Sequence, residues 1–150
     1  MTGAWSHPHH CWAVAQQDNA KRLEALGGLG PSAVPSVLGA LMRDEEVLLV
    51  LPGMTGALVL TGHRLILVRT RLPVEASGAG IRSIPYDRIT DYRFSTSRRG
   101  GLFFARSGSR QADSFTIGYE RRWAPVAADA EQLLEVLIRR ARQTDVSKPA

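Results

Sequence analysis

The stretch that decides the fold is LVLTGHRLILV, residues 58–68. It consists of two aliphatic runs on either side of Gly62 and His63. Such residues favour strands, and a two-residue loop that begins with Gly is typical of a hairpin with a type II′ turn, in which the Gly has positive φ. The stretch therefore predicts an antiparallel hairpin in which Leu60 faces Leu65.

Five further segments have the composition of short strands and are separated by turn residues. These five segments are 47–51, 81–85, 90–95, 102–106 and 114–119. Together with the two strands of the hairpin, 57–61 and 64–68, they make seven predicted strands. Short strands at this spacing predict an antiparallel sandwich or barrel.

Helical periodicity appears at both ends of the chain. In the last segment an apolar stripe is formed by Ala130, Leu133, Leu134, Leu137, Ile138 and Ala141. Acidic residues precede this stripe and Arg139, Arg140 and Arg142 follow it, which matches the helix dipole. A second helix is predicted to run from Ser32 or Ser36 to Met42, and a third, with a thin apolar face, over 13–26.

Three motifs resemble those of bacterial pleckstrin-homology (PH)-like domains of the YokE-like type. Residues 58–68 resemble their LTxxRLIxV hairpin, residues 84–89 (IPYDRI) their IPYxxI segment, and residues 44–48 (DEEVL) the start of their first strand. Gly62 departs from the pattern, which usually has Asp or Asn there. The resemblance implies a mainly β fold with helices (α+β): a seven-stranded antiparallel barrel or sandwich capped by a C-terminal helix.

The chain divides into three parts on this basis. Residues 1–37 form a partly helical N-terminal extension, 38–142 the PH-like domain, and 143–150 a flexible tail. The single Cys11 excludes an internal disulfide framework, and the longest uncharged stretch, 47–62, is interrupted by Pro52, Gly53 and Gly56. Without a visible secretory signal, we expect a cytoplasmic protein.

The positive charge is concentrated in the middle of the chain. Residues 60–125 hold 12 Arg and five acidic residues, whereas the whole chain has a net charge of +5. The loop 52–56 between the first two predicted strands carries no charge, so we expect no specific phosphoinositide binding by the usual PH route. The candidate anion patch lies elsewhere and comprises Arg98, Arg99, Arg106, Arg110, Arg121 and Arg122. These residues either occupy solvated turns or bind an anion, a membrane surface or nucleic acid.

The first three predicted strands are apolar on both faces rather than alternating. A strand that is wetted on one side should alternate, so the outer face of this sheet must be covered. The candidate protein interface comprises Val47, Leu49, Leu51, Val59, Ile66 and Val68. We favour the helix at 32–42 as the cover and a second copy of the chain as the alternative. The resemblance supports the alternative, because bacterial PH-like proteins form rings and other homo-oligomers.

Little in the sequence points to catalysis or to a cofactor. His7, His9, His10 and Cys11 are metal-ligand types, but their spacing fits no standard zinc pattern, so we predict no metal site. No nucleophile elbow, phosphate-binding loop or other catalytic motif is present. We therefore predict a non-enzymatic binding or assembly module that engages a protein partner or itself, with a basic anion, membrane-surface or nucleic-acid binder as the alternative.

Overall fold

The computed structural model describes residue 24 and residues 34–54, 56–69, 80–108 and 114–146. The strands are β1 (Val47–Pro52), β2 (Gly56–Thr61), β3 (Arg64–Arg69), β4 (Gly80–Pro85), β5 (Asp91–Ser97), β6 (Gly100–Arg106) and β7 (Ser114–Tyr119). The helices are α2 (Val34–Ala40) and α3 (Ala124–Val146), with short 3-10 turns η1 (Tyr86–Arg88) and η3 (Arg121–Trp123). All seven predicted strands are confirmed to within two residues.

Two boundaries predicted from the sequence fall inside helices. The segment assigned to a flexible tail begins at 143, but α3 continues to Val146. The boundary between the N-terminal extension and the PH-like domain, at 37, lies within α2. The helix predicted over 13–26 is outside the described residues except for Glu24, which is helical.

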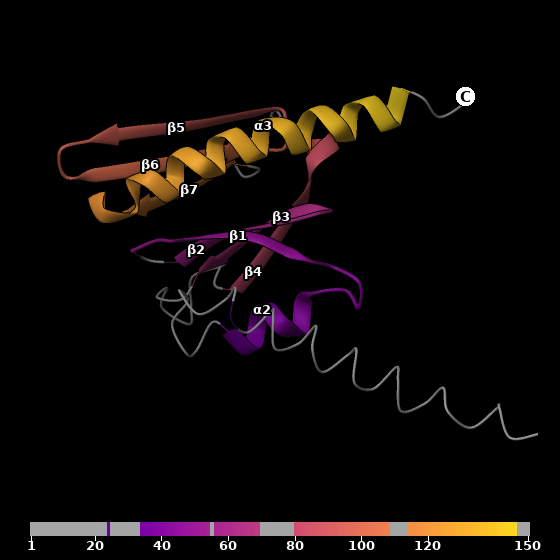
Figure 1. Ribbon diagram of the computed structural model, residues 1–150, viewed down its shortest axis with the longest axis horizontal. Helices are drawn as coiled ribbons and strands as arrows, with labels where there is room; N and C mark the ends of the chain where they lie inside the picture. Colours follow the sequence, from indigo (N-terminus) through magenta and orange to yellow (C-terminus); the bar gives the residue numbers. More distant parts are fainter. Residues whose placement is uncertain (1–23, 25–33, 55, 70–79, 109–113, 147–150) are drawn as a thin grey trace, which may run out of the picture.

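The strands form two antiparallel sheets with the orders β1-β2-β3-β4 and β5-β6-β7. Within the described ranges the sheets do not close into a barrel, so of the two predicted architectures the sandwich is the observed one. Figure 1 shows α3 lying along the three-stranded sheet, with α2 on the far side of the four-stranded sheet. The main core lies between the two sheets and α3 and includes Leu58, Leu60, Phe103, Tyr119 and Leu134.

The hairpin that decides the fold has the predicted register but not the predicted turn. Leu60 pairs with Leu65 and Leu58 with Leu67. Gly62, however, does not adopt positive φ, so the type II′ turn was wrong. The hydroxyl of Thr61 accepts hydrogen bonds from the amides of His63 (3.2 Å) and Arg64 (3.1 Å). This side chain organises the turn, and the positive φ of a type II′ turn is therefore not required.

A second, smaller core covers the outer face of the four-stranded sheet. Val37 of α2 is fully buried on Ala57, Val59, Ile66 and Val68, and Leu38 and Leu41 pack beside it. The prediction that a helix near 32–42 covers this face is confirmed. The two-sided apolar character of β2 and β3 is explained by one core on each face.

Gly101 of β6 lies directly against the ring of the buried Tyr119. A Cβ at this position would overlap the ring, so we expect Gly101→Ala to lower the free energy of unfolding by about 1–3 kcal/mol through overpacking. Gly62 is the matched control, because nothing lies within 4 Å of the position a Cβ would take there. Urea denaturation of both variants is the measurement, and equal midpoints would contradict the expectation.

Candidate functional site: a groove between α3 and β5

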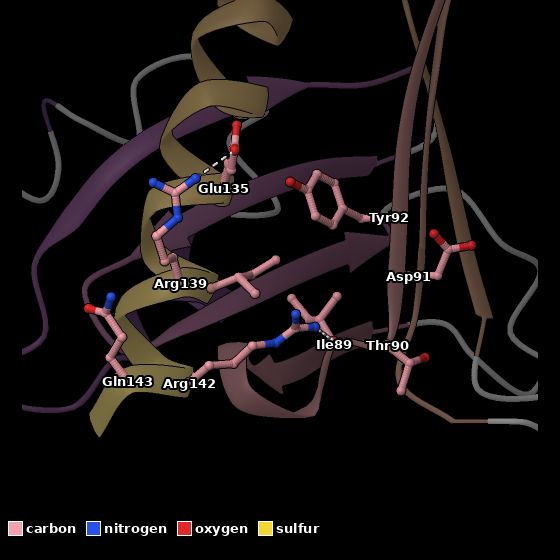
Figure 2. Close-up of a pocket in the computed structure, with 9 residues that line it drawn as sticks. Ile89, Thr90, Asp91, Tyr92, Glu135, Arg139, Arg142 and Gln143 are labelled. Carbon is pink, nitrogen blue, oxygen red and sulfur yellow. Dashed lines mark hydrogen bonds and ion pairs between the residues drawn. The ribbon is translucent and has the colours of Figure 1, made fainter. Parts of the chain in front are cut away.

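A groove of about 690 Å³ runs between the C-terminal half of α3 and the start of β5 (Figure 2). The strand side contributes Ile89, Thr90, Asp91 and Tyr92, and the helix side contributes Glu135, Ile138, Arg139, Arg142 and Gln143. The groove is open to solvent. Its size is within the range of ligand-binding pockets.

The floor of the groove is apolar. Ile89 follows η1 in an extended conformation and is 2% exposed, and Ile138, from the predicted apolar stripe of α3, is 5% exposed. Tyr92 is half-buried and points from β5 toward α3 (Figure 2). Burial raises the pKa of Tyr92, and the nearby carboxylates Glu135 and Glu131 raise it further. The phenol therefore stays protonated at neutral pH and keeps a neutral hydroxyl at the wall of the groove.

The charged groups around this floor are paired with groups of the protein. Arg139 donates to Glu135 at 2.9 Å, and Arg142 donates to the carbonyl oxygen of Ile89 at 3.2 Å. Asp91 lies 3.8 Å from Arg93 and 4.0 Å from Arg106. The rim thus carries both signs of charge, and no single sign dominates the groove.

The strand wall of the groove is the edge of a sheet. Among the strands that the structure describes, in the order β5-β6-β7, β5 has a strand neighbour on one side alone. In antiparallel pairing every second residue of an edge strand directs its N–H and C=O away from its neighbour. An edge of this kind is a template for another extended segment. The groove therefore has apolar side chains on its floor and lies beside the start of an edge strand.

The structure distributes the six residues of the predicted protein interface over both faces of the first sheet. Leu49 and Leu51 belong to the main core between the sheets. Val47, Val59, Ile66 and Val68 belong to the smaller core under α2. Because Val59, Ile66 and Val68 are at most 2% exposed under α2, a partner reaches this outer face only after α2 moves.

The structure also divides the predicted anion patch. Arg98 and Arg99 lie in the β5–β6 turn, close to Arg121 and Arg122 of η3. Arg106 is at the opposite end of β6, which at about 3.4 Å per residue is about 20 Å away. Arg110 is outside the described residues, as are His7, His9, His10 and Cys11. Among the described residues, no group of three or more His, Cys, Asp or Glu side chains is placed to hold a metal ion.

A buried carboxylate that the sequence analysis did not single out fastens α2 to the sheet. Glu45, 1% exposed, accepts hydrogen bonds from Arg64 Nε and from the Thr61 hydroxyl (2.7 Å) on one oxygen. Its other oxygen accepts from Arg64 Nη2 and from the amide of Met42, both at 3.0 Å. Arg64 also donates to the carbonyl oxygen of Ala40, at the end of α2. Burial alone would raise the pKa of Glu45, but these hydrogen bonds and the charge of Arg64 lower it to about 2.

The sequence does not indicate the groove, for an identifiable reason. The apolar stripe predicts that Arg139 and Arg142 lie in the last turn of the helix, where they complement its dipole. Because α3 continues to Val146, they lie before that turn and line the groove instead. The feature of the sequence that could have indicated the groove is Ile89, an apolar residue between η1 and the next strand. Ile138, which belongs to the same core cluster, is 49 residues away in the sequence.

The sheets of four and three strands, followed by a helix across the sandwich, have the order that the resemblance to PH-like domains implies. Two solved structures are similar to the chain. A pleckstrin homology domain from Shewanella amazonensis is 19% identical, with a TM-score of 0.45 over 61% of this chain and 83% of that chain. A DUF1696 family protein with a pleckstrin-homology domain from Shewanella loihica is 17% identical, with a TM-score of 0.48 over 71% of this chain and 90% of that chain.

The structural neighbours of this chain are thus bacterial PH-domain proteins. No protein-family model matches the sequence, and no curated protein gives a significant match. None of the described helices is long and apolar enough to cross a membrane.

Proposed function

We propose that this chain is a cytoplasmic, non-catalytic binding module that takes an extended segment of a protein partner into the groove between β5 and α3. The observation that carries the proposal is the edge strand β5 beside an apolar floor formed by Ile89, Tyr92 and Ile138. Added strands gain affinity from main-chain hydrogen bonds and specificity from alternate side chains that enter pockets. The edge of β5 would supply the main-chain groups, and the floor of the groove the apolar contacts.

The polar groups of the groove support binding rather than catalysis. Glu135 is paired with Arg139, and Arg142 with the carbonyl oxygen of Ile89. A catalytic site needs titratable groups that converge on one point where a reacting atom can lie. Here the charged groups are spread along the rim and neutralise one another.

The type of PH-like domain is part of the same proposal. We assign the chain to the YokE-like type because residues of the motifs that resemble this type make hydrogen bonds that hold the first sheet and Glu45 together. In the 58–68 hairpin, Thr61 and Arg64 hold the buried Glu45. In the 84–89 segment, the Tyr86 hydroxyl donates to the carbonyl oxygen of Thr61 at 2.5 Å. The motifs therefore act together at one end of the first sheet.

The test uses two glutamines of α3 that are both exposed, of which Gln143 lines the groove and Gln132 does not. The probe is a peptide selected on the immobilised full chain from a phage-displayed random library. We expect Gln143→Trp to weaken peptide binding by about tenfold or more, or about 1.4 kcal/mol, because the indole fills one end of the groove. Gln132→Trp should leave it unchanged. Fluorescence anisotropy gives the affinities, and hydrogen exchange should show new protection of β5 amides in the complex.

The same variants address a second copy of the chain as the occupant. In that case the wild-type chain forms oligomers in light scattering and Gln143→Trp dissociates them. If no peptide is enriched and the chain is monomeric at high concentration, or if Gln143→Trp and Gln132→Trp behave alike, the proposal is overturned.

A further inference from the structure

Four exposed arginines gather at one end of the three-stranded sheet, away from the groove. Arg98 and Arg99 form the β5–β6 turn, and Arg121 and Arg122 begin η3 directly after β7. Gly100 brings the two pairs together: its φ of 148° favours glycine, and a Cβ there would lie 3.8 Å from the amide nitrogen of Arg121. Figure 1 shows the β5–β6 turn at the same end of the molecule as the start of α3. We call this region the arginine end.

The positive charge of the arginine end is only partly neutralised. Glu120 lies 3.0 Å from Arg122, whose guanidinium also stacks over the ring of Trp123 at 5.1 Å. Arg98, Arg99 and Arg121 have no ion-pair partner among the residues that the structure describes. The local excess therefore favours an anionic partner.

Two exposed apolar side chains lie over Gly118 of β7, which precedes Arg121 by three residues in the sequence. Met54, in the β1–β2 loop, is 54% exposed, and Leu102, two residues after Gly100, is 51% exposed. Both reach over Gly118 of β7, where a Cβ would lie 3.3 Å from Met54 Cε and 3.6 Å from Leu102 Cδ2. A hydrogen bond of 2.8 Å from the Met54 amide to the carbonyl oxygen of Gly118 fixes the loop there. The absence of a side chain at Gly118 thus lets the two apolar groups lie close together.

We propose that the arginine end docks on a membrane surface that contains anionic lipids. The guanidinium groups would bind lipid phosphates, and Met54 and Leu102 would enter the boundary between head groups and acyl chains. Aliphatic side chains flanked by arginine fit this boundary better than nucleic acid. Single strands need aromatic stacking surfaces, and the neighbouring Trp123 is occupied by Arg122. The site shares no residue with the groove, so the two proposals succeed or fail separately.

The experiment measures binding of the full chain to vesicles of phosphatidylglycerol mixed with phosphatidylcholine, by flotation. Each arginine near an anionic surface contributes about fivefold to affinity, so we expect Arg98→Gln with Arg99→Gln to weaken binding by about 25-fold. The matched control is Arg88→Gln with Arg140→Gln, which removes the same charge from exposed positions elsewhere. It should change binding by less than about threefold at physiological salt, where such distant charges are screened.

Leu102→Asn distinguishes a membrane from other anions. It should weaken binding to the vesicles without changing the weak binding of a single-stranded oligonucleotide. The proposal is overturned if vesicles do not bind at low salt, if the two double variants lose affinity equally, or if Leu102→Asn has no effect on vesicle binding. Binding to the oligonucleotide that is tighter than binding to vesicles would assign the arginine end to nucleic acid and overturn it as well.

Discussion

Glu45→Gln should lower the free energy of unfolding by about 3 kcal/mol, because it breaks a buried ion pair by removing one partner. The substitution leaves Arg64 without its carboxylate in a site where Glu45 is 1% exposed. The expected cost is at the lower end of the range for broken buried pairs, because the Arg64 side chain is 21% exposed and can regain some water. Urea denaturation at pH 7 gives the value. The control is Glu135→Gln, which removes an exposed pair with Arg139 and should cost at most about 0.5 kcal/mol.

The same carboxylate predicts how stability depends on pH. Its pKa is lowered from 4.5 to about 2 in the folded chain, so its stabilising contribution is complete above about pH 4.5 and is lost as the pH falls toward 2. At 1.36 kcal/mol per pKa unit, the contribution is about 3 kcal/mol. The difference in stability between the wild-type chain and Glu45→Gln should therefore shrink between pH 4.5 and 2. Parallel pH profiles of the two proteins would show that Glu45 is not held in this way.

The elements that could be predicted were those whose cause is local. Strand-like composition, regular spacing and turn residues placed the seven strands, and the hairpin register of residues 58–68 follows from its two-residue loop. Because β2 and β3 are apolar on both faces, the sequence was enough to predict that another element covers the outer face of this sheet. The failure at Gly62 is instructive: glycine permits positive φ, but the neighbouring Thr61 hydroxyl satisfies the turn without it.

The features that could not be predicted depend on which distant residues meet. Glu45 stands among three consecutive acidic residues, and nothing local shows that it alone is buried against Arg64. The groove depends on the packing of Ile89 against the stripe of α3, which is set by tertiary structure. The arginine patch was predicted as one set from charge and from the positions of the predicted turns, and the strand direction of β6 separates Arg106 from Arg98 and Arg99.

The groove and the arginine end lie near opposite ends of the same helix. From Ala124, next to η3, to Arg142 in the groove, α3 rises about 27 Å at 1.5 Å per residue. A membrane surface at one end and a polypeptide in the groove would therefore not compete for space. The straight helix would hold them at a fixed separation, a geometry suited to presenting a partner near a surface.

Val37→Asp is the second change for which we expect a large effect. Val37 is fully buried between α2 and the outer face of the first sheet, and an unpaired carboxylate there is too costly to keep. We expect α2 to leave the sheet, at a cost of about 3 kcal/mol for the lost burial of Val37 and the adjoining Leu38 and Leu41. Thermal unfolding and binding of an apolar dye are the measurements. Gly39→Asp is the matched control, because it adds the same charge to the exposed side of the same helix, where nothing lies within 4 Å.

This variant also separates the two explanations for an apolar outer face. If the helix is its cover, Val37→Asp exposes Val59, Ile66 and Val68, and light scattering should show association that rises with protein concentration. If a second copy were the natural cover, the wild-type chain would already be an oligomer through this face, and an oligomer that survives removal of residues 1–30 would show it. Equal behaviour of Val37→Asp and Gly39→Asp would mean that the packing of α2 does not protect this face from association. If the wild-type chain is monomeric and Val37→Asp associates, the seven-residue helix α2 is what prevents association through the outer face of the first sheet.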